Sequence, residues 1–466
     1  MAEGYAVCID VGKTLSKVTL WSRQGSLLDR QVRPNRAASI DSLIRLDASG
    51  IEAWLMDVLT SYAPHPVEFI VPVAHGAAAA VIEDDALAFP PIDYEQALPE
   101  DVCAAYQAER PAFAETGSPS LPNGLNLGAQ LSWLQSLYPQ AMESGTIVPW
   151  PQYWAWFLSG RCVSEVTSLG CHSDLWSPLP GHFSSMARLK GWDQRFAQLV
   201  EACEVVGQLR ADIAAKTGLP NTTKILAGLH DSNAALMAAR GFPQVSGKEA
   251  TVLSTGTWFI AMRMARERIE MERLPEARDC LINVDAYSAP VPSARFMGGR
   301  EIKTLIGESP GRIDDKAIQS ALIAAVPQVL DEQAMVLPTL APGCGPFPQG
   351  QSEWLNPPSE QNARLAAICL YAALVTTTSL RLIGSIDCLL VEGRFADSEV
   401  FVRALASLRP DLQIFVADGE TDVSFGALRL IDPELVPAAA LQPVEPLDHD
   451  LSAYAEKWHS HVEAFT

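Results

Sequence analysis

Two segments of this chain share one pattern, in which an apolar strand leads into a polar turn with a glycine and then into a second strand. In the first copy, residues 5–9 are apolar, residues 10–14 (Asp-Val-Gly-Lys-Thr) form the turn, and residues 16–21 alternate polar and apolar side chains. That alternation is the period of a half-buried strand. Residues 250–262 repeat the order around a turn at 254–257 (Ser-Thr-Gly-Thr). Two related α/β halves would explain the repetition.

The length of the chain agrees with two halves. A chain of 466 residues is too long for one ordinary core, and two domains of about 200 residues each are expected. The loop at 241–248, which contains Pro243 and Gly247, is the best candidate for the boundary. We therefore predict an N-terminal domain over 1–242, a C-terminal domain over 243–440 and a C-terminal tail over 441–466.

Several other segments have a clear period or composition. Residues 51–59 have helical spacing of apolar side chains, and residues 68–71 form a strand that we expect to end at Pro72. Residues 224–227 predict a strand that leads into a small-residue helix ending near Ala239. Residues 361–383 predict a long helix that is apolar on most faces and therefore buried.

The charge balance excludes some partners. Lysine and arginine number 34 against 55 aspartates and glutamates, a formal net charge of −21. A surface this acidic repels phosphate backbones and anionic lipids, so we expect no nucleic acid partner and no membrane partner. A nucleotide would have to be held locally, by backbone N–H groups, a metal ion or a few hydroxyls.

Targeting signals and cysteines indicate the compartment. The sequence has no apolar run of about 18 residues and no secretory signal pattern at its start. Its nine cysteines are odd in number and scattered, and none forms a C-x-x-C pair. We expect reduced thiols and a cytoplasmic protein.

The first turn can hold phosphate, although it is not a P-loop. A P-loop would need a glycine at Val7 and a helix after Thr14, where a strand is predicted. Gly12 lets the backbone approach an anion, and the N–H groups around Lys13 and Thr14 can point at its oxygens. Asp10 can bind Mg²⁺, through water and in company with substrate phosphates. An ordinary tight turn would have the same residues.

The second turn, Ser254-Thr-Gly-Thr257, places three hydroxyls and a glycine between apolar strands. A Ser/Thr-rich hairpin has the same composition. Two such turns in the same strand context are harder to explain by chance than either alone.

Asp231 lies where a predicted strand meets a helix, in Gly228-Leu-His-Asp231. A carboxylate there can be a helix N-cap. It can also be a general base, because phosphoryl transfer needs a positioned hydroxyl and a group that takes its proton. We interpret the neighbouring His230 as structural.

Together these segments resemble the FGGY carbohydrate kinases, of the actin, hexokinase and heat-shock ATPase superfold, over residues 5–435. Residues 10–14 look like the family's first phosphate turn, residues 228–234 like its catalytic G-x-[HG]-D-x-x-A, and residues 254–258 like its second phosphate turn. The adenosine loop corresponds to 391–397, and residues 424–427 resemble the closing small-residue helix. The resemblance implies an α/β fold of two actin-like, RNase H-like ATPase domains with an interdomain cleft.

The resemblance also assigns the site. It makes Asp231 the catalytic base in a sugar-binding N-terminal domain, Asp10 the Mg²⁺ contact, and ATP the nucleotide of the C-terminal domain. The residues that it assigns to the sugar are Ala74, His75, Gly76, Asp93 and Glu95. The residues that it assigns to the nucleotide are Gly12, Lys13, Thr14, Ser254, Thr255, Gly256, Thr257, Gly298, Gly299, Gly393 and Asp397. A lone histidine such as His75 is also commonly structural. The aromatic cluster at 150–156 can pack its helix or stack on a sugar.

Some residues depart from the family pattern. Lys13 replaces a threonine, and Glu392 and Arg394 replace glycines of the adenosine loop. Asp397 stands where relatives often have asparagine, and Asp93-Tyr-Glu95 matches the family's W-x-D-x-R loosely. The pattern looks closest to the L-rhamnulose and L-fuculose kinases.

The expected function is thus transfer of the ATP γ-phosphate to a deoxyketose. The alternatives are a kinase for another polyol (xylulose, ribulose or glycerol) and a non-catalytic nucleotide-dependent binding protein on the same superfold. A small-molecule sugar is the expected partner, and a homodimer is compatible with the resemblance.

Overall fold

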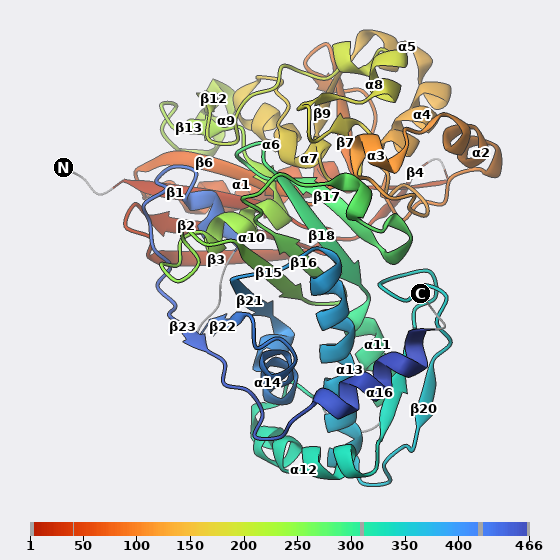
Figure 1. Ribbon diagram of the computed structural model, residues 1–466. Helices are drawn as coiled ribbons and strands as arrows, with labels where there is room; N and C mark the ends of the chain where they lie inside the picture. The colour runs from red at the N-terminus through yellow and green to blue at the C-terminus, as the bar shows by residue number, and fades with distance from the viewer. Residues whose placement is uncertain (1–3, 41, 308–311, 418–422, 464–466) are drawn as a thin grey trace. The chain divides into compact units, whose positions relative to one another are not determined.

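The computed structural model describes residues 4–40, 42–307, 312–417 and 423–463 (Figure 1). Contacts divide the chain into two compact units. Unit 1 comprises Met1–Gly241, Ile282–Pro290 and Thr421–Ala438, and unit 2 comprises Phe242–Leu281, Val291–Glu420 and Ala439–Thr466. The first segment of unit 1 ends at Gly241, whereas the predicted domain boundary follows residue 242. Two short segments later in the chain also belong to unit 1.

A seven-stranded sheet forms the centre of unit 1, in the order β12-β13-β6-β1-β2-β3, with β14 also paired to β6. Its strands are β1 (Tyr5–Val11), β2 (Leu15–Ser22), β3 (Leu27–Pro34), β6 (Val67–Ala74), β12 (Val205–Gln208), β13 (Lys224–Leu226) and β14 (Leu229–His230). β1, β2 and β3 are antiparallel, whereas β6 runs parallel to β1, β13 and β14. The hairpin predicted over residues 5–21 is confirmed.

The prediction that the strand near residue 70 ends at Pro72 is wrong. β6 continues to Ala74, and Pro72 pairs with Ile9 of β1. On its other side β13 stops at Leu226 and β14 resumes at Leu229 with one extra residue in between. Proline offers no N–H to a ladder, and here the neighbouring strand is interrupted opposite it. Gly228 makes the interruption possible: its φ is +75°, and a Cβ there would lie 1.9 Å from the Pro72 carbonyl oxygen.

Helices cover both faces of this sheet. Alternate residues of β1 point into two different cores, as the period of a strand requires. Val7 and Ile9 belong to the core that includes residues of α1 (Ala48–Ser61), α6 (Trp150–Ser159) and α9 (Ala211–Thr217). Ala6 and Cys8 belong to the core beneath α10 (Asp231–Ala239) and α15 (Val423–Leu428), which pack on each other.

Within unit 1, a long insertion leaves the central sheet after β6 and returns to it at β12, and much of it packs around a core of its own. Its strands are β7 (Ala79–Glu83), β8 (Ala86–Leu87), β9 (Thr146–Pro149), β10 (Trp176–Ser177) and β11 (His182–Phe183). Its helices, besides α6, are α2 (Glu100–Glu109), α3 (Phe113–Thr116), α4 (Leu127–Leu137), α5 (Pro139–Ser144), α7 (Val166–Leu169) and α8 (Ser185–Leu189). The short pair β4 (Ala38–Ile40) and β5 (Leu43–Arg45) precedes α1.

Unit 2 is also built on a sheet, in the order β17-β18-β16-β15-β21-β22-β23. The strands are β15 (Ala250–Thr255), β16 (Phe259–Arg263), β17 (Cys280–Val284), β18 (Pro290–Phe296), β21 (Cys388–Gly393), β22 (Gln413–Ala417) and β23 (Leu441–Pro443). β19 (Met335–Leu337) and β20 (Glu353–Leu355) form a separate pair. The helices are α11 (Gly298–Ile306), α12 (Gln319–Asp331), α13 (Gln361–Leu382), α14 (Glu399–Leu408) and α16 (Ser452–Val462).

α13 is the predicted buried helix. It has 22 residues and is apolar enough to cross a bilayer by length and composition, but 89% of its most apolar window is buried inside the protein. It is therefore the core helix of unit 2.

The expected C-terminal tail contributes to unit 2 over its described residues. β23 pairs with β22, and the buried Trp458 of α16 donates its Nε1–H to the Val336 carbonyl at 2.7 Å. No pattern in the sequence predicts that β23 and α16 pack in unit 2.

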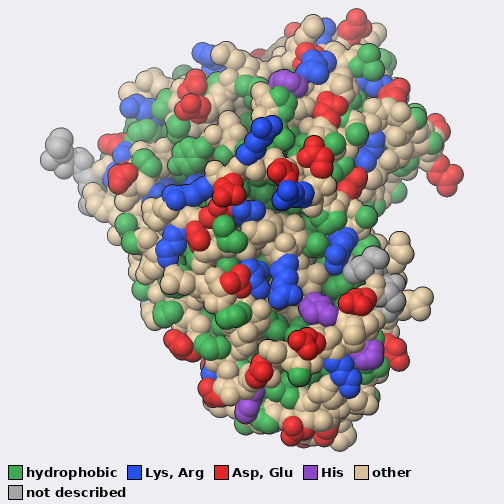
Figure 2. Space-filling model, viewed as in Figure 1, with side chains coloured by type: hydrophobic (Ala, Val, Ile, Leu, Met, Phe, Trp, Pro, Cys, Tyr) green, Lys and Arg blue, Asp and Glu red, His purple; other side chains and the backbone are tan. Residues whose placement is uncertain are grey.

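The cysteines and the surface charges can be located in the structure. All nine cysteines lie in the described part of the chain and are free. On the face shown in Figure 2, acidic and basic side chains are interspersed.

Candidate active site

Three of the predicted site segments in unit 1 leave the same edge of its sheet. Val11 of β1 and His230 of β14 both pair with Ala74 of β6. The next residues along these three strands are Gly12, Asp231 and His75. In open α/β sheets, ligands bind beyond the carboxyl ends of parallel strands. The sheet register thus brings the first turn, the proposed base and the proposed sugar-binding stretch together.

Asp231 begins α10, and the N-cap position before it is held by His230. Its side chain is 32% exposed. Oδ1 accepts the Ser232 backbone N–H at 2.6 Å and lies 3.1 Å from His230 Nε2. Among the described residues, no hydrogen bond or ion pair involves Oδ2. One oxygen is therefore held in place, and the other can accept a proton.

A buried polar cluster lies behind this carboxylate. Cys171 Sγ is 3.8 Å from His230 Nε2, and the His230 backbone N–H donates to Thr167 Oγ1 at 2.9 Å. Thr167 in turn donates its backbone N–H to Glu165 Oε2 at 3.0 Å.

The charged groups of this cluster shift one another's pKa. Burial opposes protonation of His230, but the charges of Cys171 and Asp231 outweigh burial and raise the His230 pKa to about 9. Burial would raise the pKa of Cys171, yet His172 and His230 lower it to about 5. Burial raises the pKa of Glu165 to about 8. The arrangement favours an imidazolium at 230 beside a thiolate at 171. Sequence reasoning missed Cys171 and Glu165, because only the fold brings residues so distant in the chain to His230.

Lys13 contacts the predicted sugar loop. Its ammonium is ion-paired with Asp93, whose side chain is fully buried, and lies 3.4 Å from Glu95 Oε2. It also lies 5.1 Å from the centre of the Tyr94 ring. The role of Lys13 as a phosphate contact stays a prediction, and in this structure its charge neutralises the carboxylate of Asp93.

His75 is buried next to this loop. Its ring lies 5.6 Å from that of Tyr94 and 6.4 Å from that of Trp150. Burial lowers its pKa, which favours the neutral imidazole. Nδ1 is 2.7 Å from the Gly76 carbonyl oxygen, which can only accept, so the proton belongs on Nδ1. Nε2 is then an acceptor suited to a sugar hydroxyl.

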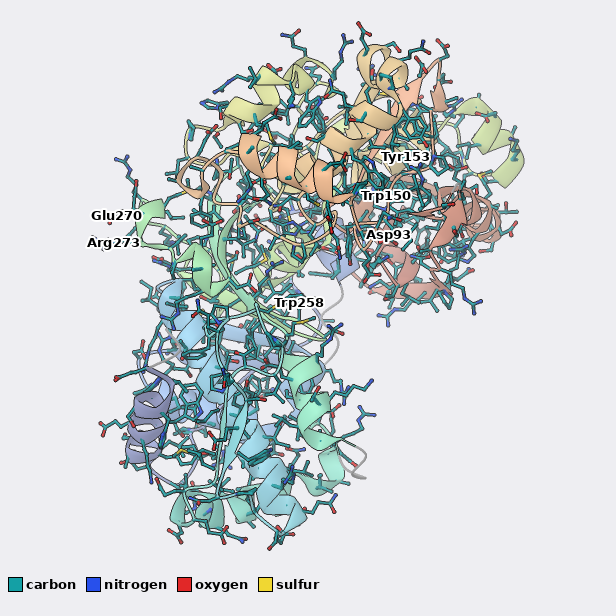
Figure 3. All side chains as sticks on the ribbon, turned by 90° about the vertical axis from the view of Figure 1, so that its right-hand side faces the viewer. Asp93, Trp150, Tyr153, Trp258, Glu270 and Arg273 are labelled. Carbon is teal, nitrogen blue, oxygen red and sulfur yellow. The ribbon has the colours of Figure 1, made fainter. Side chains whose placement is uncertain are left out.

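The hollow at this edge is small. Its lining includes Gly12, Lys13, His75, Asp93 and Trp150, and its free volume is about 20 Å³. A sugar would need the Lys13–Asp93 pair to move. Figure 3 shows Asp93, Trp150 and Tyr153 within unit 1. In the aromatic cluster, Trp150 lines the hollow, whereas Trp154 is fully buried in the core.

In unit 2 the predicted nucleotide residues come together from three segments. The second turn connects β15 to β16, and Gly256 donates its N–H to the Trp258 carbonyl at 3.0 Å. The start of α11 lies directly against it, since a Cβ on Gly299 would be 2.0 Å from the Gly256 carbonyl oxygen. Gly393, at the end of β21, pairs with Thr255. The hydroxyl of Thr255 donates to the Glu392 carbonyl at 2.5 Å and so links the two strands.

Two charged residues in the predicted adenosine loop, Arg394 and Asp397, have local partners. Arg394 makes a bidentate pair with Asp314, at 2.6 and 2.9 Å, which helps to lower the pKa of that carboxyl. Asp397 is 3.1 Å from Lys316 Nζ. Residues 314–316 therefore supply the ionic partners of both Arg394 and Asp397, although no pattern in the sequence marks this segment.

The metal prediction for Asp10 rests on one carboxylate. Asp10 Oδ2 lies 3.4 Å from Lys17 Nζ. Among the described residues there is no group of three or more His, Cys, Asp or Glu side chains that could hold a metal ion. A single carboxylate fits an ion such as Mg²⁺ that keeps most of its ligands as water and substrate phosphate.

Two α/β units, one with a carboxylate at its sheet edge and one with a glycine-lined turn, are the architecture of two-domain sugar kinases. Residues 247–439 match the family model described as carbohydrate kinase FGGY, C-terminal domain. The structure of a carbohydrate kinase from Novosphingobium aromaticivorans is 57% identical, with a TM-score of 0.97, and the match covers 100% of this chain and 99% of that one. The chain belongs to the FGGY carbohydrate kinase family.

Curated relatives match more distantly. L-fuculokinase of Escherichia coli (strain K12) is 23% identical over 290 residues, which is 56% of this chain and 57% of that protein. Rhamnulokinase of Ligilactobacillus salivarius (strain UCC118) is 30% identical over 110 residues, 23% of this chain and 22% of that protein. The matched part of the chain thus spans little more than half the length of the fuculokinase.

Proposed function

We propose that this protein is an ATP-dependent sugar kinase, in which Asp231 takes the proton from the acceptor hydroxyl as the γ-phosphoryl group is transferred. The observation that carries the proposal is the position of Asp231. It lies at the same sheet edge as Gly12 and His75, with Oδ1 held by Ser232 and His230 and Oδ2 without a partner among the described residues.

The proposed sugar contacts lie in unit 1 and the proposed nucleotide contacts in unit 2. His75 Nε2, Asp93 and Glu95 accept hydrogen bonds from sugar hydroxyls in unit 1. The backbone around Gly256, Gly298 and Gly299 holds the nucleotide in unit 2. Mg²⁺ supplies positive charge that neutralises the phosphate oxygens, and Asp10 would hold it through water.

The acceptor is a ketose, and a deoxyketose such as L-rhamnulose or L-fuculose is the first choice. The support is the pattern of the motifs together with relatives named fuculokinase and rhamnulokinase. Xylulose, ribulose and glycerol are the alternatives to test. We assign the enzyme to the cytoplasm, with a small sugar as its partner.

The test is sugar-dependent release of ADP from Mg-ATP over a panel of pentuloses, hexuloses and deoxyketoses. Replacement of the base by Asp231→Asn should lower kcat at least about 10²-fold, because general-base catalysis contributes about 10²–10⁴-fold. Sugar binding, followed by thermal shift with ADP, should persist. Activity within about tenfold of the parent would refute the assignment of the base. Absence of turnover with every sugar, together with retained ADP binding, would favour a nucleotide-dependent binding protein.

A further inference from the structure

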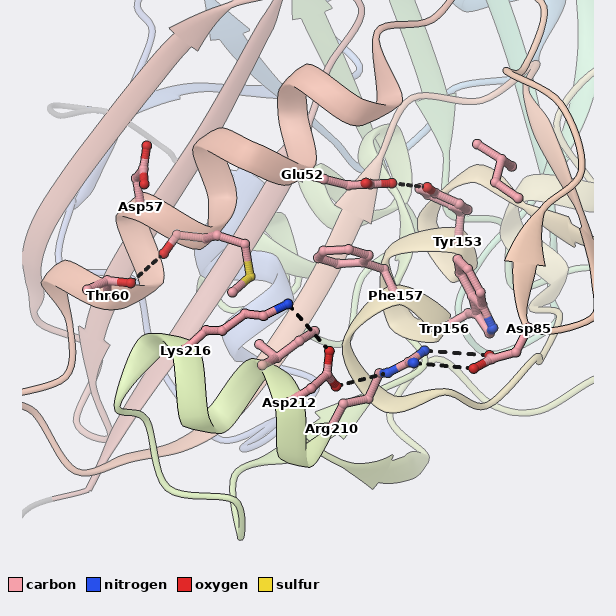
Figure 4. Close-up of a pocket in the computed structure, with 13 residues that line it drawn as sticks. Glu52, Asp57, Thr60, Asp85, Tyr153, Trp156, Phe157, Arg210, Asp212 and Lys216 are labelled. Atoms are coloured by element: carbon pink, nitrogen blue, oxygen red, sulfur yellow. Dashed lines mark hydrogen bonds and ion pairs between the residues drawn. The ribbon is translucent and has the colours of Figure 1, made fainter.

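Unit 1 contains a second and much larger hollow, formed by α1, α6, α9 and the turn between β7 and β8 (Figure 4). Its volume is about 530 Å³, within the range of about 300–1,000 Å³ typical of small-molecule sites. None of the residues that line it has a role in the proposed reaction.

Part of the wall is aromatic and aliphatic. α6 contributes Tyr153, Trp156 and Phe157, and Met56 of α1 and Ile213 of α9 complete the apolar surface. Such a wall accommodates an alkyl chain, and ring faces also attract cations.

The basic side chains of the hollow are already neutralised. Arg210 is 3.2 Å from Asp85 and 3.4 Å from Asp212, and Lys216 is 3.8 Å from Asp212. Figure 4 shows these contacts grouped at one side. An anionic ligand would have to break them.

Glu52 lies at the other side of the hollow and has no cationic partner in the part of the chain that the structure describes. Its only described contact is the hydroxyl of Tyr153, which donates to Oε1. Burial of the side chain raises the Glu52 pKa, which means that the carboxylate lacks the stabilisation that a cation would supply. Exposed Asp57, five residues further along α1, adds negative charge.

We propose that this hollow binds a small organic cation, an alkylammonium whose charged end pairs with Glu52 and whose chain lies on the rings of α6. A neutral polyol would leave Glu52 without a countercharge. An ammonium supplies one and donates charge-assisted hydrogen bonds, while its chain covers apolar surface.

Helices α1 and α6 also line the small hollow beside His75 and Asp93, which is the proposed place of the acceptor sugar. Ile51, next to Glu52 on α1, lines it, and so does Trp150, which stacks on Tyr153 with 5.0 Å between ring centres and 14° between planes. Occupancy of the larger hollow should therefore change acceptor affinity. This second part rests on the proposed kinase function.

The binding test uses the full chain with n-pentylammonium chloride as probe and 1-pentanol as its neutral counterpart. Tryptophan fluorescence and thermal shift should show saturable binding of the ammonium and at least about tenfold weaker binding of the alcohol, the effect of losing a charge-assisted hydrogen bond. Glu52→Gln should weaken ammonium binding by about tenfold or more. Glu143→Gln, which removes one exposed charge from α5, should leave it unchanged. Equal binding of both probes, or equal affinity of the Glu52→Gln protein, would overturn the proposal.

The coupling test measures acceptor KM with and without saturating n-pentylammonium. A change of about twofold or more in the parent, absent in Glu52→Gln, is expected. An unchanged KM in an active enzyme that binds the probe would overturn the coupling and leave the site standing. Because probe binding is measured without turnover, failure of the kinase proposal would be seen separately, as absence of ADP release with every sugar.

Discussion

The two strand–turn–strand segments of this chain start from the same pattern and end in different chemical settings. In unit 1 the turn at 10–14 is surrounded by charge: Lys13 pairs with Asp93 and Asp10 lies near Lys17. In unit 2 the turn at 254–257 is surrounded by backbone, because α11 approaches Gly256 and the Thr255 hydroxyl bonds to a neighbouring strand. The same local pattern is thus placed among charged side chains in one unit and against backbone in the other, and variants of the two turns should differ accordingly.

Loss of the proposed base in Asp231→Asn should have the largest effect, a fall in kcat of at least about 10²-fold.

The next largest effect should be the loss of stability in Lys13→Met, which tests whether the unit 1 turn depends on charge. It would leave Asp93 buried without its cation, and breaking a buried pair in this way costs about 3 kcal/mol. Chemical denaturation measures the loss.

The control for this variant is Lys216→Met, whose partner Asp212 is exposed. Such a surface pair contributes at most about 1 kcal/mol. Equal losses for the two lysines would contradict the view that charge organises the unit 1 turn.

The unit 2 turn can be tested with two glycines. A Cβ on Gly299 would lie 2.0 Å from the Gly256 carbonyl oxygen, whereas a Cβ on Gly256 would have no atom closer than 3.8 Å. Gly299→Ala should therefore lower stability and raise the nucleotide KM about tenfold, or about 1.4 kcal/mol. Gly256→Ala should preserve stability and raise the nucleotide KM alone. Acceptor KM should change in neither, and a change there would break the assignment of the nucleotide to this turn.

The cluster behind Asp231 predicts a specific pH dependence. The raised pKa of His230 contributes stability below pH 6.5 that is lost as pH rises through about 9. The lowered pKa of Cys171 contributes stability above pH 9 that is lost as pH falls through about 5. Glu165, whose pKa is raised to about 8, contributes stability below pH 4.5 that is lost as pH rises through about 8. Between pH 5 and 6.5 the trends of Cys171 and Glu165 offset each other, whereas between pH 6.5 and 8 the trends of His230 and Glu165 outweigh that of Cys171. The cluster should therefore keep the free energy of unfolding level from pH 5 to 6.5 and lower it from pH 6.5 to 8.

Cys171→Ser, which nearly keeps the size of the side chain but removes the thiolate, should leave the Glu165 trend unopposed, so the free energy of unfolding of this variant should fall from pH 5 to 6.5. Urea titrations at half-unit steps of pH would measure it. An unaltered slope in the serine variant would show that residue 171 is a neutral thiol.

The smallest effect should come from Asp397→Asn. Both Asp397 and its partner Lys316 are largely exposed, so stability should change by less than about 0.5 kcal/mol. If Asp397 lies at the nucleotide, the ATP KM should change while the acceptor KM does not. A matching change in acceptor KM would place its influence elsewhere.

Local pattern was enough to predict the two strand–turn–strand segments and the buried helix of this fold. The hairpin over 5–21, the second strand–turn–strand and α13 follow from periodicity and glycine, which act over a few residues. The interruption opposite Pro72 was missed, because it depends on a neighbouring strand about 155 residues away.

For the candidate site, the sequence predicts motif residues at turns and strand ends, but it does not predict the partners that set their charge. Cys171 near His230, Asp314 at Arg394 and Asp93 at Lys13 are long-range contacts with no spacing to recognise. The assignment of each motif residue to sugar, nucleotide or metal remains a prediction for the variants above.

The insertion between β6 and β12 begins and ends on the same central sheet, and two of its parts are fitted to that sheet: α6 shares a core with Val7 and Ile9, and Thr167 accepts the backbone N–H of His230 next to Asp231. Asp93, Tyr94 and Trp150 all belong to this insertion. If these residues contact the sugar, as proposed, the rest of the insertion carries the selectivity for the acceptor. Chimaeras that exchange residues 75–204 with another family member, but keep α6 and Thr167 of this chain, should then take the donor's choice of sugar and retain the recipient's nucleotide KM.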